Sequence, residues 1–141
     1  MMVLVDTSVW SLALRKRSGD LSTAEERIVA TWTDLVRWGR IRIIGPIRQE
    51  LLSGVRSDKQ FTQLESALRA FPDEALDAQD YVAAARDFDL CRSRGVTATH
   101  TDMLICATAI RRNWPVFSAD ADFGRFARVL PLRLHRPARE S

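Results

Sequence analysis

Four acidic side chains stand next to the apolar segments of this sequence. Asp6 and Asp120 come after short apolar runs, Asp102 lies in the first turn of an apolar helical stretch, and Glu50 lies in the first turns of the helix predicted after the second strand. Taken singly, each has an ordinary explanation as a helix cap, a partner of the helix dipole, a solvated helix residue or a turn residue. Their joint placement instead suggests acids that are delivered to one edge of a sheet.

Four carboxylates gathered at one place would repel each other strongly. Two unit charges about 4 Å apart cost on the order of 1 kcal/mol in water and about 4 kcal/mol at an effective dielectric of 20. Such a site requires a cation, and hard oxygen ligands without histidine or thiolate suit Mg²⁺ or Mn²⁺. An ion of this kind polarises a phosphoryl oxygen and activates water, so phosphodiester hydrolysis is the expected chemistry.

The elements that would position these acids alternate between strands and helices. Apolar runs predict the strands, and amphipathic stretches with capping residues and terminal glycines predict the helices. We expect strands at 3–5, 41–44, 116–118 and, weakened by Pro131, within 128–134, and helices at 8–14, 23–38, 46–52, 58–70, 74–93 and 101–112. This alternation predicts an α/β fold with a central parallel sheet that helices cover on both faces.

Length and composition indicate one globular domain. The chain has 141 residues, 46% of them hydrophobic and 28% charged, and a formal net charge of +3. We expect a single domain at 1–135 followed by a frayed tail at 136–141. No apolar run approaches the length of a membrane span and the N-terminus lacks signal-peptide features, so we expect no membrane partner and a cytoplasmic location. Cys91 and Cys106 are expected to be reduced packing residues.

The motifs around the four acids resemble those of the PIN-domain nucleases. In chain order they read VDTSVW at 5–10, P-x-x-x-E-L-L-x-G at 46–54, D-x-L-I-x-A-T-A at 102–109 and S-A-D-A-D-F at 118–123. The set is most similar to the toxin subunit of VapBC-type toxin–antitoxin pairs. This resemblance implies a three-layer α/β/α PIN-like fold and a ribonuclease that depends on Mg²⁺ or Mn²⁺ and often cuts transfer RNA or ribosomal RNA. It also implies a homodimer and a small antitoxin protein as partner.

The resemblance also implies a role for each matching residue. The catalytic set would be Asp6, Glu50, Asp102 and Asp120. Asp6 and Asp102 would bind the metal directly, Asp120 directly or through water, and Glu50 would hold the metal or orient the attacking water. The accessory residues would be Thr7, Ser8, Asp122 and Ser118, the last in a place where the family usually has threonine.

Three arginines are candidates for holding RNA phosphates: Arg15, Arg48 and Arg125. Arginine suits bidentate phosphate contacts, although a solvated basic face is an equally ordinary role for each of them. Arg48 and Glu50 are two residues apart on one predicted helix, about 200° around its axis, so the two side chains cannot both face the metal directly.

Two other functions share the same acidic site. A DNA-directed metal nuclease uses the same chemistry, but such enzymes usually carry extra elements that clamp DNA. A PIN-like module that binds nucleic acid without cutting it would keep the fold without turnover. A haloacid-dehalogenase-type phosphotransferase is disfavoured, because Ser8 stands where its second aspartate belongs and the lysines, Lys16 and Lys59, are not suitably placed.

Overall fold

Three short parallel strands form the centre of the molecule. The computed structural model describes residues 1–137, so most of the tail expected at 136–141 lies outside the described residues. The strands are β1 (Val3–Val5), β2 (Ile41–Arg42) and β3 (Val116–Phe117), and their order in the sheet is β2-β1-β3. Leu4 lies opposite Arg42 on one side and Val116 on the other, and both pairings are parallel. β1 is aliphatic and fully buried, as a parallel strand between two helical layers must be.

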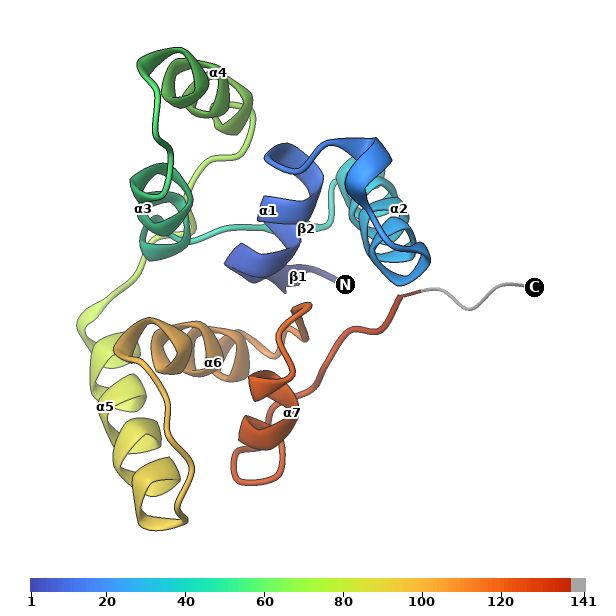
Figure 1. Ribbon diagram of the computed structural model, residues 1–141. Helices are drawn as coiled ribbons and strands as arrows, with labels where there is room; N and C mark the ends of the chain where they lie inside the picture. The colour runs from blue at the N-terminus through green and yellow to red at the C-terminus, as the bar shows by residue number, and fades with distance from the viewer. Residues whose placement is uncertain (138–141) are drawn as a thin grey trace.

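Helices cover both faces of this sheet (Figure 1). Within residues 1–137 they are α1 (Thr7–Leu14), the 3₁₀ turn η1 (Ser18–Asp20), α2 (Thr23–Arg37), α3 (Gly45–Ser53), α4 (Asp58–Leu68), α5 (Ala78–Ser93), α6 (His100–Arg112) and α7 (Asp122–Phe126). Helices α1 to α4 lie on one side of the strands, and α5, α6 and α7 lie on the other. The predicted three-layer α/β/α arrangement is therefore confirmed.

Helix α6 lies in the core of the layer that contains α5, α6 and α7. Residues 103–109 are all buried, and the helix packs most extensively against α5. Its N-terminus is capped by Thr99, and it ends at Asn113, whose φ of 58° places it in the left-handed conformation common after a helix. The free thiols of Cys91 and Cys106 are both buried, as expected of packing residues.

Two expected elements differ in the structure. The helix expected at 74–93 begins at Ala78, because the preceding residues run beside β2, where Ile43 bridges to Asp73 and accepts a 2.8 Å hydrogen bond from the Glu74 N–H. The weak strand expected at 128–134 is reduced to a bridge between Leu134 and Val116. Across residues 1–137, none of the helices is both long enough and apolar enough for a membrane span.

Candidate active site

Asp6 is the buried centre of the candidate site. It follows β1 directly and caps α1, because its Oδ2 accepts a hydrogen bond from the Ser8 backbone N–H at 3.3 Å. The same oxygen accepts from the Ser8 hydroxyl at 2.7 Å and from the Ser118 hydroxyl at 2.8 Å. Asp6 is 5% exposed, and burial raises its pKa, while the two hydroxyl donors act in the opposite direction. The residue is thus both a helix cap and a candidate functional group.

Two serine hydroxyls join the end of β1 to the end of β3. The Ser8 hydroxyl accepts from the Ala119 N–H at 2.9 Å, and the Ser118 hydroxyl accepts from the Asp120 N–H at 2.9 Å. Each hydroxyl has one proton, and both are placed to donate it to Asp6. The 3.2 Å separation between the two oxygens is therefore a contact and not an additional hydrogen bond. Both serines contact Asp6, and their accessory role stays a prediction.

Asp102 enters the site from the first turn of α6. Its backbone N–H donates to the Thr99 hydroxyl at 3.0 Å, which fixes the start of the helix. Partial burial raises the pKa of Asp102, hydrogen bonding to Thr99 lowers it, and the negative charges of Asp6 and Asp120 raise it further. The charges of Asp6 and Asp120 therefore act on Asp102, although the three residues come from separate parts of the chain.

Asp120 and Asp122 form the open side of the site. Asp120 is exposed, and its Oδ1 accepts a 2.9 Å hydrogen bond from the Asp122 N–H, which tightens the turn into α7. The Asp122 carboxylate forms an ion pair with Arg125 three residues later. Asp122 is therefore directed along α7, and Arg125 already has an acidic partner on the surface.

Glu50 stands apart from the other three acids. It is exposed on α3, and no hydrogen bond or ion pair within residues 1–137 joins it to Asp6, Asp102 or Asp120. Thr7 lies between the buried Asp6 and Ser8, and its Oγ1 is buried without a hydrogen-bond partner among the described residues. The Trp32 indole N–H and the Thr108 hydroxyl are buried in the same way, so the unpartnered hydroxyl of Thr7 does not by itself mark a ligand site.

All three candidate RNA-binding arginines have partners within the chain, and Arg125 pairs with Asp122 as described above. Arg15 donates to the carbonyl of Gly54 at 3.0 Å, so it ties the end of α1 to the end of α3. Arg48 forms a 3.0 Å ion pair with Asp73 and donates to the carbonyls of Leu68 and Phe71. The Arg48 guanidinium is therefore engaged by the segment after α4 and is not presented to a ligand at the acidic site.

The chemistry of the donor set fits a divalent cation. Asp6, Asp102 and Asp120 offer oxygen ligands, and a bound positive charge would offset the burial and the neighbouring negative charges that raise the pKa of Asp102. All three hydrogen bonds to Asp6 described above go to Oδ2, which leaves Oδ1 outside them. No group of three or more acidic, histidine or cysteine side chains in the described chain is already at metal-binding spacing, so binding requires the side chains to close in.

Comparison with known proteins identifies the family. A family model described as the PIN domain matches residues 3–129. The chain belongs to the PIN-domain family. The VapC ribonuclease Mb1587 of Mycobacterium bovis and the ribonuclease VapC11 of Mycobacterium tuberculosis are each 34% identical to it over 134 residues, which is 94% of this chain and 96% of each relative.

Solved structures with the PIN fold superpose on nearly the whole chain. FitAcB from Neisseria gonorrhoeae matches with a TM-score of 0.74 at 23% identity, over 96% of this chain and 98% of the other. VapBC2 from Rickettsia felis, bound to a DNA fragment from its promoter, matches with a TM-score of 0.75 at 18% identity and the same coverage. The expected PIN-like fold and the similarity to VapC-type proteins are confirmed.

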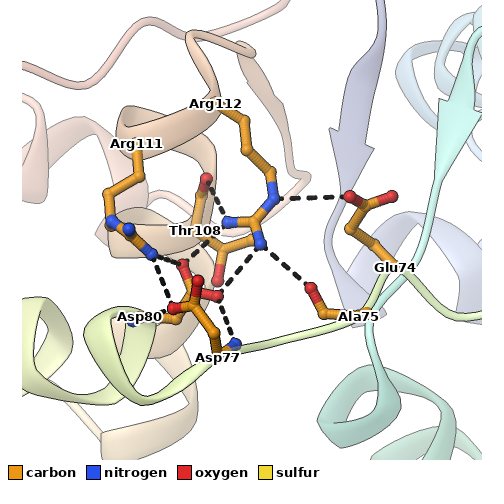
Figure 2. A network of polar contacts seen from close by, with 7 residues as sticks. All are labelled: Glu74, Ala75, Asp77, Asp80, Thr108, Arg111 and Arg112. Carbon is orange, nitrogen blue, oxygen red and sulfur yellow. Dashed lines mark hydrogen bonds and ion pairs between the residues drawn. The ribbon is translucent and has the colours of Figure 1, made fainter.

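This PIN domain also contains a polar network that the sequence analysis missed (Figure 2). Asp80 is fully buried at the start of α5 and accepts hydrogen bonds from Arg111 and from both terminal nitrogens of Arg112, at the end of α6. Hydrogen bonds from Arg112 hold the pKa of Asp80 well below its usual range. Asp77 and Glu74 add further contacts to the two arginines.

The network holds α6 in position and contains none of the predicted site residues. It lies at the C-terminal end of the helix, while Asp102 lies in the first turn of the same helix. Reciprocal capping by Asp77 and Asp80 is a signal that the sequence carries, since each side chain accepts from the backbone N–H of the other. The pairing with Arg111 and Arg112, about thirty residues later, has no local sequence signal.

Proposed function

We propose that this PIN domain is a divalent-metal-dependent endoribonuclease and the toxin of a type II toxin–antitoxin pair. The observation that carries the proposal is the buried Asp6 carboxylate at the end of β1, which the Ser8 and Ser118 hydroxyls hold at the carboxyl edge of the sheet. The names of the relatives support RNA as the substrate, because those proteins are called VapC ribonucleases. Transfer RNA or a ribosomal RNA loop is the expected target, and the cytoplasm, where both occur, is the expected location.

The metal ligands in this proposal are Asp6, Asp102 and Asp120. Mg²⁺ and Mn²⁺ are the ions that suit such oxygen donors. A divalent ion held there would polarise the scissile phosphate and lower the pKa of a water molecule. Ser8 and Ser118 hold the Asp6 carboxylate in place, and the buried Thr7 hydroxyl is available to bind a water or a substrate oxygen at the same edge.

The remaining predicted residues take supporting roles. Glu50 is exposed on α3 and can approach the site to orient the attacking water when RNA is bound. Asp122 positions the turn after β3 through its contacts with Asp120 and Arg125. Arg125 and Arg15 are surface cations that can exchange their present partners for a phosphate, whereas Arg48 has three internal contacts and is assigned a structural role.

The proposal includes two protein partners. Solved structures of similar fold carry VapBC in their names, and this supports an antitoxin as the cognate partner. A homodimer of this chain is the expected assembly. Light scattering of the purified chain, alone and with the product of the adjacent antitoxin gene, measures both.

Cleavage of total cellular RNA tests the activity. Purified protein is incubated with Mg²⁺, with Mn²⁺ and with EDTA, beside Asp6→Asn and Asp102→Asn proteins prepared in the same way. We expect discrete metal-dependent cuts with 5′-phosphate and 3′-hydroxyl ends that both variants lack. Equal cutting by the variants, or 2′,3′-cyclic phosphate ends, would contradict the proposal. A parallel assay with single- and double-stranded DNA separates an RNA-directed enzyme from a DNA-directed one.

A further inference from the structure

A small hollow lies between α3, α5 and α6. Its volume is about 250 Å³, and it is lined by Pro46, Tyr81, Ala84, Ala85, His100, Thr101 and Leu104. Most of these side chains are apolar, and the rim contains two aromatic rings. His100 and Thr101 belong to the same first turn of α6 as Asp102, so the hollow and the acidic site share one structural element.

The two aromatic rings at the rim of the hollow, those of His100 and Tyr81, differ in their surroundings. The His100 imidazole stacks on Phe88, with ring centroids 4.7 Å apart and planes at 19°, and the residue is exposed. The Arg92 guanidinium lies 5.8 Å from the centroid of the same Phe88 ring. Tyr81 is 55% exposed on α5. Aromatic surface of this extent on a polar rim is expected where an amphipathic, flat ligand binds.

The size and position of the hollow favour a single nucleobase as its occupant. Pockets for drug-sized ligands occupy roughly 300–1,000 Å³, so this hollow suits a smaller group. Proteins that read single-stranded RNA stack unpaired bases on histidine and tyrosine rings. His100 and Thr101, which line the hollow, directly precede Asp102 in the first turn of α6.

We propose that this hollow is a nucleobase subsite, in which one unpaired base of the RNA stacks against His100 and Tyr81 next to the phosphate that is cut. The proposal rests on the proposed ribonuclease function and adds to it the residues that select the cut site. His100 and Tyr81 contact the base, and Leu104 and Ala84 form the apolar floor. The bound RNA must be single-stranded at this nucleotide, because a paired base cannot leave its stack without first unpairing.

Fluorescence of 2-aminopurine in single-stranded oligoribonucleotides tests the subsite. The Asp6→Asn protein is used as the parent, so that bound RNA is not cut, and Tyr81→Ala, His100→Ala and His100→Phe are added to it one at a time. Trp38→Ala is the matched control, since Trp38 is 58% exposed but lies at the end of α2. Anisotropy gives the affinity, quenching reports the stacking, circular dichroism verifies folding, and light scattering gives the oligomeric state.

We expect the probe to be quenched at one position when it binds the parent. Tyr81→Ala and His100→Ala should each weaken binding about tenfold and remove the quenching, because loss of an aromatic platform removes the stacking interaction. His100→Phe should retain both, and Trp38→Ala should match the parent. Unchanged affinity in both alanine variants, or equal loss in His100→Phe and His100→Ala, would overturn the subsite.

Two further outcomes separate this proposal from the proposed function. If the unmodified chain makes no metal-dependent cuts in RNA but the quenching still depends on Tyr81 and His100, the function fails and the base site stands. If cutting occurs and the alanine variants differ from the parent in oligomeric state alone, the hollow is a contact between copies of the chain and the base site fails.

Discussion

At the scale of the single residue, two effects shift the pKa of Asp6 in opposite directions. Burial raises the pKa of its carboxyl group, and hydroxyl donors from Ser8 and Ser118 lower it. The donors also fix the carboxylate in one orientation, since both of them bind Oδ2. A carboxylate that is buried and held in this way is pre-organised to bind a cation, because little side-chain entropy remains to be lost.

Replacement of Ser118 tests this pre-organisation. Ser118→Ala removes one donor to Asp6 and the acceptor of the Asp120 N–H, so we expect cleavage to fall at least about tenfold while the free energy of unfolding falls by about 1 kcal/mol. Ser118→Thr keeps the hydroxyl and should retain most of the activity. Urea denaturation and RNA cleavage give the two values, and Ser53→Ala, which removes a hydroxyl from the exposed side of α3, is the control.

Neutralisation of Asp102 should stabilise the metal-free protein. The pKa of Asp102 is raised in the fold, so the folded state binds its proton more tightly than the unfolded state does. Ionisation of Asp102 therefore lowers the free energy of unfolding. This loss is absent below the unfolded pKa, near 3.8, and grows as the pH rises through the folded pKa. We expect the free energy of unfolding of Asp102→Asn to exceed that of the parent by about 0.5–1 kcal/mol at pH 7 in EDTA, as charge removal at strained functional sites often gives. This difference should disappear near pH 3.5.

Thermal unfolding at the two pH values measures this difference. Asp58→Asn is the control, because Asp58 is also in the first turn of a helix but is exposed on α4. That variant should be no more stable than the parent at pH 7, since it loses a favourable interaction with the helix dipole. An Asp102→Asn protein that is less stable than the parent at pH 7 would contradict the prediction.

At the scale of the elements, local patterns in the sequence predict most of the fold. The aliphatic run at 3–5, the capping box of Ser22 with Glu25 and the apolar stretch at 102–109 each lead to an element that the structure contains. The start of α5 was placed too early, because the pairing of Asp73 with Ile43 is a tertiary interaction that competes with helix formation. Local patterns do not encode such long-range partners.

Part of the candidate site can also be predicted from the sequence. The rule that ligands lie beyond the carboxyl ends of parallel strands predicts a site at Asp6, Ser118 and Asp120, and in the structure Ser118 hydrogen-bonds to Asp6 and to the Asp120 backbone N–H. The roles of these residues in a reaction stay predictions. The same rule does not fix side-chain direction, so it could not distinguish the internal contacts of Arg48 from a phosphate-binding role. Nor could it reveal the arginine network of α6, which depends on two helices packing side by side.

Replacement of Asp80 should destabilise the packing of α5 against α6. Asp80→Asn takes the negative charge away from Arg111 and Arg112, and a partner lost from a buried ion pair costs on the order of 2–4 kcal/mol. The pKa of Asp80 is lowered in the fold, so its contribution is present above the unfolded pKa and is lost as the pH falls toward the folded value. The parent should therefore lose stability below about pH 4 more steeply than the variant.

Chemical denaturation between pH 7 and pH 3 follows this effect. Asp89→Asn removes a similar but exposed ion pair with Arg92 from the same helix, and we expect it to leave stability unchanged. Equal stability of the Asp80→Asn and Asp89→Asn proteins would show that the arginine network contributes nothing measurable.

At the scale of the whole molecule, a bound cation should stabilise the fold. An ion that binds the native state alone adds about 2.7 kcal/mol at a concentration one hundred times its dissociation constant. We expect Mg²⁺ or Mn²⁺ to raise the melting temperature of the parent but not of Asp6→Asn or Asp102→Asn. Calorimetry with and without EDTA measures this independently of RNA cleavage, and an equal rise in all three proteins would remove these carboxylates from the metal site.

The hydrogen bond between Ser118 and Asp6 joins residues that are 112 positions apart in the chain. A ribosome makes Asp6 long before Ser118 and Asp120, whereas α5 and α6 are close in sequence and can pack together before β3 is made. A partly made chain therefore lacks one side of the acidic site. If the protein is a ribonuclease, its nascent chain is harmless to the ribosome and messenger that are producing it until the segment with β3 has emerged and docked.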